Sequence, residues 1–284
     1  MLCIIEQATS QHLTPKSLRH AGNNVSLEDF LAQDAASVRA MVAQNVLPVV
    51  HGGANTTALL VIDIEEPARP DGFCALNRST LVRVVDALRL RVAALKHAMP
   101  RCSVSFYGTS SPSDFPPGFR AGHSRRPRTG YGRAGAPTRL HIAKALGGYR
   151  RASALGLFDD VEYSTPSLYL TPGQDPENVT REVLDCAERG VLRSNGTAVP
   201  LAPFLSWVYE GPKGGADYHC ALSAEAMRQQ LAVLEQAGAV RVPVIAWFNG
   251  MDNKTDMCGG FRDQLAWMQR NGFVPSHCRS KFSI

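Results

Sequence analysis

Short apolar runs alternate with amphipathic segments along most of the chain. The apolar runs predict strands at 46–50, 58–64, 102–107, 161–170, 201–209 and 243–249, and residues 1–6 are a further candidate. Between these runs, apolar residues recur at helical spacing. This spacing predicts helices at 27–45, 79–98, 137–155, 176–190 and 223–238, and a last one near 260–270.

Regular alternation of strands and helices is typical of a parallel sheet with helices outside it. The run ALLVI at 58–62 suits a strand that is covered on both faces. Strand–helix units follow one another, and neither a GxGxxG nor a GxxxxGK[ST] motif occurs, so the pattern favours an α/β fold of the (β/α)8 TIM-barrel type. Residues 108–137 interrupt it with a long Pro-, Gly- and Arg-rich loop, and we expect a single domain over 1–284.

Two carboxylates stand at the end of the most apolar predicted strand. Asp63 and Glu65 are two residues apart, so side-chain alternation places them on one face. In a β/α barrel the active site lies at the carboxyl ends of the strands. Close carboxylates push each other's pKa values apart, which lets one stay protonated and act as a general acid. The sequence therefore predicts a catalytic acid pair, and the alternative is a pair of surface carboxylates.

Aromatic residues stand near the ends of the later predicted strands: Tyr107, Tyr169, Trp207, Tyr209 and Trp247. A flat ring with a polar tip offers a sugar both apolar area and a hydrogen bond. Core packing is the alternative for any one of them. Together with the two acids, the set predicts a sugar-binding cleft.

The ordered motifs resemble a known family. They are Ile-Asp-Ile-Glu-Glu-Pro (62–67), Ser-Phe-Tyr-Gly (105–108), Pro-Ser-Leu-Tyr-Leu (166–170), Pro-Phe-Leu-Ser-Trp-Val-Tyr (203–209) and Val-Ile-Ala-Trp-Phe (244–248). Over residues 46–250 the chain resembles hyaluronidases and, more loosely, the chitinase-like glycoside hydrolases. The family has three strands before its acid pair, whereas 62 residues precede Asp63 here. We therefore expect a barrel that is irregular or incomplete at its N-terminal end.

The resemblance implies a substrate and a mechanism. Glu65 matches the proton donor, and Asp63 matches the carboxylate that orients the substrate's 2-acetamido group, which attacks the anomeric carbon in place of an enzyme nucleophile. The aromatic residues named above match the walls of the substrate subsites. The implied substrate is an N-acetylhexosamine polysaccharide of the hyaluronan or chondroitin type, and no cofactor or metal is implied. Ile64 departs from the Trp that hyaluronidases favour between the acids.

Three other interpretations stay open from the residues. A muramidase-type glycosidase also pairs Asp and Glu at a barrel strand end and acts on peptidoglycan. A non-catalytic carbohydrate-binding barrel would keep the aromatic residues alone. A metal-dependent phosphodiesterase barrel would need paired ligands, and His51 has no partner at a suitable spacing.

Composition and charge bear on partners. The net charge of +5 argues only weakly for an acidic partner. The arginines of the 108–137 loop are not interleaved with aromatic residues apart from Tyr131, so we expect no nucleic-acid partner. No apolar run is long enough to cross a bilayer. The oligomeric state stays open.

The sequence features that bear on the cellular location of the protein conflict with one another. Residues 1–13 lack the basic start, apolar stretch and cleavage site of a signal peptide. However, 6 of the 10 asparagines lie in N-glycosylation sequons, namely Asn24, Asn55, Asn77, Asn178, Asn195 and Asn253. Seven cysteines allow three disulfides. We therefore expect a secreted or lysosomal glycoprotein with disulfide bonds.

Overall fold

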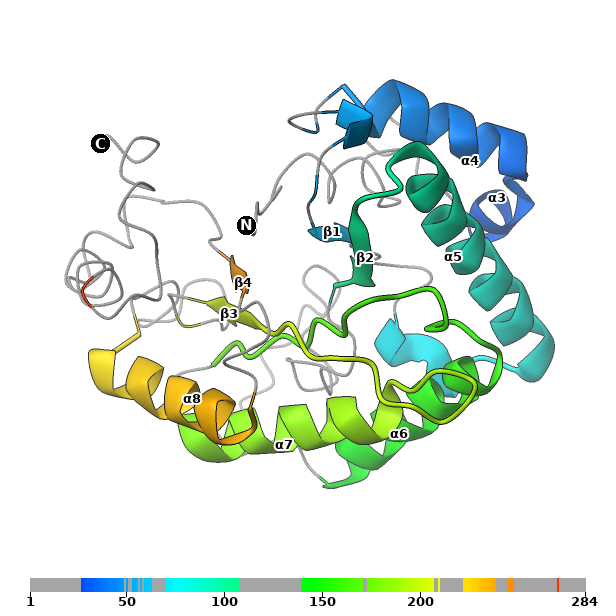
Figure 1. Ribbon diagram of the computed structural model, residues 1–284. Helices are drawn as coiled ribbons and strands as arrows, with labels where there is room; N and C mark the ends of the chain where they lie inside the picture. The colour runs from blue at the N-terminus through cyan, green and yellow to red at the C-terminus, as the bar shows by residue number, and fades with distance from the viewer. Residues whose placement is uncertain are drawn as a thin grey trace, which may run out of the picture.

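Helices form an outer arc around short strands in the structure, a computed structural model (Figure 1). It describes residues 27–48, 50, 53–55, 57, 59–62, 70–107, 139–170, 173–206, 209, 222–238, 245–247 and 270. The α-helices are α3 (Leu27–Ala32), α4 (Ala35–Met41), α5 (Arg78–Ala98), α6 (Arg139–Ala154), α7 (Pro176–Gly190) and α8 (Ala224–Gln236). Shorter helical segments are η1 (Val42–Val46), η2 (Gly53–Asn55) and η3 (Pro70–Ala75).

The described strands form two parallel pairs. β1 (Leu59–Ile62) pairs with β2 (Ser103–Phe106), so that Leu59 faces Ser103. β3 (Phe204–Ser206) pairs with β4 (Ile245–Trp247), so that Phe204 faces Ile245.

The segment 163–168 joins the two pairs through single parallel bridges. It contacts the end of β2 at Tyr107↔Thr165 and the approach to β3 at Ser164↔Leu201. The backbone nitrogen of Phe204 donates to the carbonyl of Pro166 at 2.8 Å. The order in space is therefore β1, β2, 163–168, β3 and β4, with a helix in every connection.

Parallel neighbours in chain order are the arrangement of a β/α barrel, because a doubly wound sheet reverses its strand order. Within the described residues the strands form an open arc and do not close into a ring. The structure therefore supports an α/β fold with barrel-type strand order.

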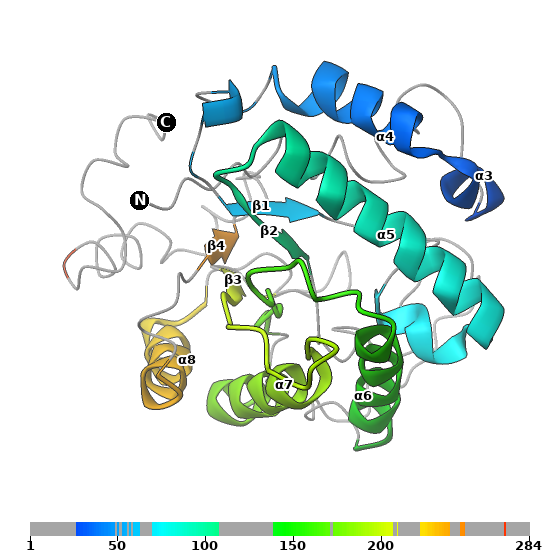
Figure 2. The same ribbon diagram turned by 45° about the vertical axis from the view of Figure 1, so that its right-hand side comes forward.

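Two hydrophobic cores separate the strands from the helices. Figure 2 shows α6, α7 and α8 in a row on one side of the strands, and α5 on another. The larger core joins β1 and β2 to α5, for example through Ile62, Phe106 and Leu88. The second lies under α7 and α8 and contains Leu205.

The long helix α5 formed as its sequence predicts. Asn77 is its N-cap and accepts a hydrogen bond from the backbone nitrogen of Thr80 at 2.9 Å. Its buried positions recur at helical spacing, as at Leu81, Val84 and Leu88.

A buried arginine fastens α3 to α5. The guanidinium of Arg91 lies 3.8 Å from the centre of the Phe30 ring, and it donates to the Gln33 side chain. It also donates to the carbonyl of Ala87 at 2.7 Å. Burial lowers the pKa of Arg91 to about 10.

Two predicted boundaries are wrong. The described residues 46–48 and 50 are not in a strand, because the π-helix η1 extends to Val46 and is followed by its C-cap, Leu47. The predicted helix 27–45 breaks after Ala32, and Asp34 caps α4 by accepting from the backbone nitrogen of Ser37 at 2.8 Å.

The remaining predicted elements fall near their expected places. The helices α5 to α8 lie at the predicted ranges 79–98, 137–155, 176–190 and 223–238, with ends that differ by at most two residues. The strands β1 to β4 lie inside the predicted ranges 58–64, 102–107, 201–209 and 243–249 and are shorter than predicted, by up to three residues at each end for β3. The predicted strand 161–170 makes only isolated bridges. The helix predicted near 260–270 lies outside the described residues except for Arg270, which is helical.

Candidate functional site

Successive residues of β1 pack on opposite sides of the strands. Leu60 and Ile62 belong to the core beneath the helices. Leu59 belongs to a separate cluster, and Val61 packs against it. We call this cluster the inner cluster, and its members are Leu59, Tyr169, Ala202 and Phe204, with Val61, Tyr107 and Tyr163 packed against them.

Three aromatic rings meet in the inner cluster. The ring of Tyr107 lies 6.4 Å from that of Tyr169 and 5.1 Å from that of Phe204, edge to face in the second case. These residues come from three neighbouring segments, the end of β2, residues 163–169 and β3. Tyr107 stays half-buried, whereas Tyr169 is buried. The parallel order of the segments thus gathers two of the predicted substrate-binding residues.

Small hydroxyl side chains line the same side of the strands. Ser105, Thr165 and Ser167 are buried. Ser105 donates to the backbone carbonyl of Tyr163 at 2.7 Å, and Thr165 donates to the carbonyl of Phe106. Since buried hydroxyls need partners, these bonds hold residues 163–167 against β2.

The hydroxyl of Ser167 also reaches the Tyr107 side chain. The Ser167 Oγ and the Tyr107 hydroxyl oxygen are 3.4 Å apart. The contact orients the polar tip of the ring that lies between Tyr169 and Phe204.

The other predicted site residues are placed differently. Tyr209 packs against the core beneath α7 and α8, away from the inner cluster. Trp247 ends β4, where its backbone is paired with Ser206. Asp63, Glu65 and Trp207 lie outside the described residues.

Sequence reasoning missed Tyr163, Thr165 and Ser167 as members of this side. The signal was present, because Tyr163, Thr165, Ser167 and Tyr169 all bear hydroxyl groups at a spacing of two. That alternation indicates one polar face of an extended segment. Phe204 gives no such signal, since an apolar residue in a strand is equally suited to the helix side.

The described cysteines lend no support to the predicted disulfides. Cys74, Cys102 and Cys186 are not joined to one another, and the other four cysteines lie outside the described residues. Burial and, secondly, the charge of Asp185 raise the pKa of the Cys186 thiol to about 12. This thiol is therefore protonated near neutral pH and is a poor nucleophile.

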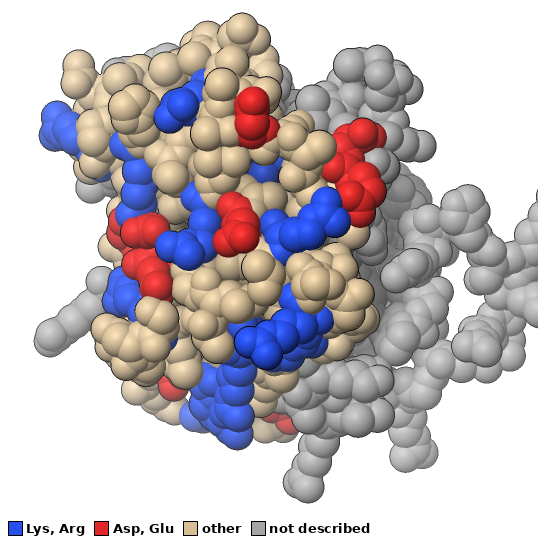
Figure 3. All heavy atoms as spheres, turned by 90° about the vertical axis from the view of Figure 1, so that its right-hand side faces the viewer, with Lys and Arg blue, Asp and Glu red and all other residues tan. Residues whose placement is uncertain are grey.

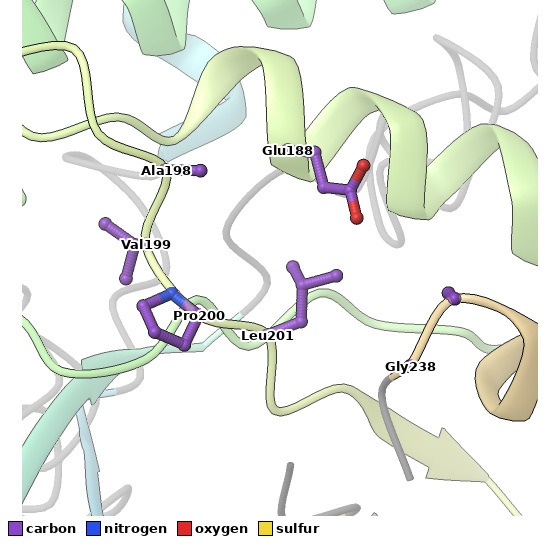
Figure 4. Close-up of a pocket in the computed structure, with 7 residues that line it drawn as sticks. Glu188, Ala198, Val199, Pro200, Leu201 and Gly238 are labelled. Atoms are coloured by element: carbon purple, nitrogen blue, oxygen red, sulfur yellow. The ribbon is translucent and has the colours of Figure 1, made fainter. Parts of the chain in front are cut away.

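A shallow pocket lies at the amino ends of the strands, opposite to the carboxyl ends where Tyr107 and Tyr169 lie. Its volume is about 290 Å³, and Figure 4 shows Glu188 of α7 facing the segment that leads into β3. The lining residues are Glu188, Ala198, Val199, Pro200, Leu201, Ala237 and Gly238. Because residues 198–201 precede β3, the pocket lies away from the carboxyl ends of the strands. It is not part of the candidate site.

Charges of both signs cover the face formed by α3 and α5 (Figure 3). Arg83 of α5 pairs with Glu28 of α3 at 2.8 Å. Lys96 of α5 pairs with Glu162, whose other carboxylate oxygen accepts from the backbone nitrogen of Val104 at 2.7 Å. Acidic groups thus interrupt the basic ones, and this side resembles an ordinary solvated surface.

Neither a metal cluster nor a membrane span occurs in the part of the chain that the structure describes. No three His, Cys, Asp or Glu side chains there gather closely enough to hold a metal ion. Of the helices described, none combines the length and the apolar character needed to cross a membrane.

Comparison with known proteins identifies the fold alone. No family model and no curated protein matches the chain. A monoclinic crystal structure of bee venom hyaluronidase matches with a TM-score of 0.50 and 12% identity, over 85% of this chain and 78% of that chain. The chain has a TIM-barrel-like fold.

Two further solved structures are similar to this TIM-barrel-like chain. Bee venom hyaluronidase in complex with a hyaluronic acid tetramer has a TM-score of 0.48 and 14% identity, over 85% of this chain and 75% of that one. D-allulose 3-epimerase from Methylomonas sp. in complex with D-allulose has a TM-score of 0.36 and 11% identity, over 85% and 83%. All three structural neighbours are enzymes.

Proposed function

We propose that this chain is a glycoside hydrolase that cleaves an N-acetylhexosamine polysaccharide of the hyaluronan or chondroitin type. Glu65 is the proton donor and Asp63 orients the substrate's acetamido group. The observation that carries the proposal is the inner cluster, in which Tyr107 and Tyr169 meet beside β1.

The spacing along β1 links the acid pair to this cluster. Leu59 and Val61 pack on the inner side. Residues 63 and 65 follow at the same spacing of two, so if the alternation continues beyond Ile62 we expect both carboxylates on the side that holds the two tyrosines. The polar character of that side, with Ser105 and Thr165 buried on it, suits a sugar better than a purely apolar core.

The tyrosines have a distinct role from the acids. The half-buried ring of Tyr107 offers apolar area to a sugar face, and its hydroxyl, held by Ser167, offers a hydrogen bond. Tyr169 backs the Tyr107 ring at 6.4 Å and fixes its angle. A pyranose bound there lies against a rigid wall.

Cleavage then proceeds in two steps. Glu65 gives its proton to the glycosidic oxygen as the bond from that oxygen to the anomeric carbon breaks. The acetamido oxygen, oriented by Asp63, forms a bond to the same carbon in its place. Glu65, now ionised, takes a proton from water, and the water oxygen displaces the acetamido oxygen. The products are two shorter chains, and Glu65 regains its proton.

Paired variants test the assignment of the acids. A reducing-end assay against hyaluronan, chondroitin, chitin oligomers and peptidoglycan is run on the parent chain, Glu65→Gln, Asp63→Asn and the control Glu66→Gln. Glu65→Gln removes the donated proton at constant volume, and general acid catalysis contributes about 10²–10⁴-fold to rate. We expect Glu65→Gln and Asp63→Asn to lose at least a hundredfold in rate. Glu66→Gln, at the opposite parity, keeps most of it.

The four substrates separate the alternatives. Cleavage of peptidoglycan alone identifies a muramidase, and binding without release of reducing ends identifies a carbohydrate-binding barrel. Undiminished cleavage by Glu65→Gln removes that residue from the mechanism. A Glu66→Gln variant as inactive as Glu65→Gln contradicts the alternation on which the assignment rests.

A further inference from the structure

We propose that Asn195 is an acceptor of an N-linked glycan and that it lies on the side of the molecule away from the candidate site. Asn195-Gly196-Thr197 is one of six sequons, where chance would give about one. The proposal concerns a covalent modification of the chain, and it does not depend on the proposed hydrolysis.

Asn195 stands at the exposed tip of a short hairpin between α7 and β3. An antiparallel bridge joins Leu192 to Ala198, and the backbone nitrogen of Arg193 donates to the carbonyl of Thr197 at 2.8 Å. Gly196 has a φ of +83°, a conformation that glycine adopts at no steric cost. The tip thus presents a defined turn to solvent, and residues 194–198 are all exposed.

The side chain of Asn195 is held in a way that leaves its nitrogen available. Its Oδ1 accepts from the backbone nitrogen of Thr197 at 2.9 Å. Among the described residues its Nδ2 makes no hydrogen bond, and Thr197, whose hydroxyl completes the sequon, is itself exposed. The turn therefore binds the amide oxygen of Asn195, and it leaves the amide nitrogen without a hydrogen bond to the described residues.

Two other sequons are less open. At Asn178 the Nδ2 donates to Asp175 at 2.9 Å, and the Thr180 hydroxyl donates to the carbonyl of Pro176 at 2.6 Å. Thr180 is buried. At Asn77 the Oδ1 caps α5, and the sequon hydroxyl of Ser79 donates to that same oxygen at 2.8 Å.

The transfer replaces one bond by another. The Nδ2 of Asn195 forms a bond to the anomeric carbon of an oligosaccharide carried on a lipid pyrophosphate. The bond from that carbon to the pyrophosphate oxygen breaks, the lipid pyrophosphate leaves, and the nitrogen gives one proton to a base. No electrons are exchanged.

The position of the hairpin gives this glycan a definite place. Residues 191–199 precede β3, so the hairpin lies at the amino ends of the strands. Tyr107 follows β2 and Tyr169 follows residues 163–168, so both lie at the carboxyl ends. A glycan on Asn195 therefore leaves the inner cluster uncovered.

Two substitutions of one residue test the acceptor without disturbing the turn. Thr197→Ala removes the sequon hydroxyl but keeps the backbone nitrogen that Asn195 binds, and Thr197→Ser keeps both. The full chain is directed by an added leader through the secretory pathway of cultured eukaryotic cells. Enzymatic release of N-glycans in ¹⁸O-water followed by peptide mapping marks each occupied asparagine as labelled aspartate. Asn45, exposed and outside any sequon, is the internal control.

We expect labelled aspartate at residue 195 in the parent chain and in Thr197→Ser. Thr197→Ala loses this label and migrates faster on a gel by the mass of one glycan, while labels at other sequons are unchanged. An unlabelled Asn195 in secreted parent protein overturns the proposal. So does label that persists at residue 195 in Thr197→Ala, because that label then has a source other than sequon glycosylation.

Discussion

Phe106 and Tyr107 are sequence neighbours that pack on opposite sides of the strands, and they offer a matched pair of substitutions. Phe106 is buried on the helix side, with its ring centre 6.4 Å from that of Phe158. Tyr107 lies in the inner cluster against Tyr169 and Phe204. We consider Phe106→Leu and Tyr107→Leu, which replace each ring by the same aliphatic side chain.

The structure predicts similar losses of stability for the two variants. Phe106→Leu loses one aromatic pair, worth about 0.5–1.5 kcal/mol, and leaves a small cavity, so we expect a total of about 1–2 kcal/mol. Tyr107→Leu loses two aromatic pairs, about 1–3 kcal/mol together. Both losses are smaller than the roughly 5–15 kcal/mol by which a domain is stable. Both variants should therefore fold.

The two variants should differ in activity although they are similar in stability. Free energies of unfolding come from urea titration, and initial reducing-end rates at low substrate are divided by the folded fraction. Loss of a sugar contact worth about 1.4 kcal/mol is a tenfold loss of rate, which we expect of Tyr107→Leu. Phe106→Leu should stay within about twofold of the parent. Equal rates for the two variants, or a larger loss in Phe106→Leu, would refute the functional division between the two sides.

Three further predictions concern the framework. The pKa of Cys186 rises from 9.0 to about 12 on folding, so between these pH values the unfolded state loses its proton first and stability falls with rising pH, by up to about 1.4 kcal/mol per pH unit. Urea titrations from pH 8 to 11 should show a shallower fall in Cys186→Ala, and equal slopes would contradict this. Asn77→Ala should cost about 1 kcal/mol by urea titration through loss of the α5 cap, whereas Asn77→Asp should cost less because it keeps the acceptor oxygen. Arg91→Lys should cost about 1–3 kcal/mol, since an ammonium cannot stack flat on Phe30 while bonding Gln33 and Ala87, and an unchanged urea midpoint would disprove that role.

Elements with long periodic patterns could be predicted from sequence because many residues agree. α7 has Asp175 as N-cap and Pro176 in its first turn, and its buried residues recur at helical spacing to Gly190. Each of these signals is weak by itself, and together they fix both ends of the helix.

Elements could not be predicted in this way where a short stretch suits two local structures equally well. The run 46–50 is apolar, but Val46 is four residues after Val42 and both are buried on one side of η1. A short apolar run fits a strand or a helix end equally well, and tertiary packing decides. Asp34 is likewise compatible with a helix interior or an N-cap, and its bond to Ser37 selects the cap.

In the candidate site, too, residue spacing predicts only part of the arrangement, and packing contacts determine the rest. Spacing alone says that two residues share a side, and it does not say which side. In the approach to β3 and in β3 itself, Ala202 and Phe204 belong to the inner cluster, whereas Leu201 and Leu205 belong to the core under α7 and α8. Tyr209 also packs against that core. Applied to β1, the same counting starts from Leu59 and Val61, both on the inner side, and reaches Asp63. Tyr209 is therefore assigned to packing by its own contacts, whereas the side on which Asp63 and Glu65 lie stays a prediction from the alternation along β1.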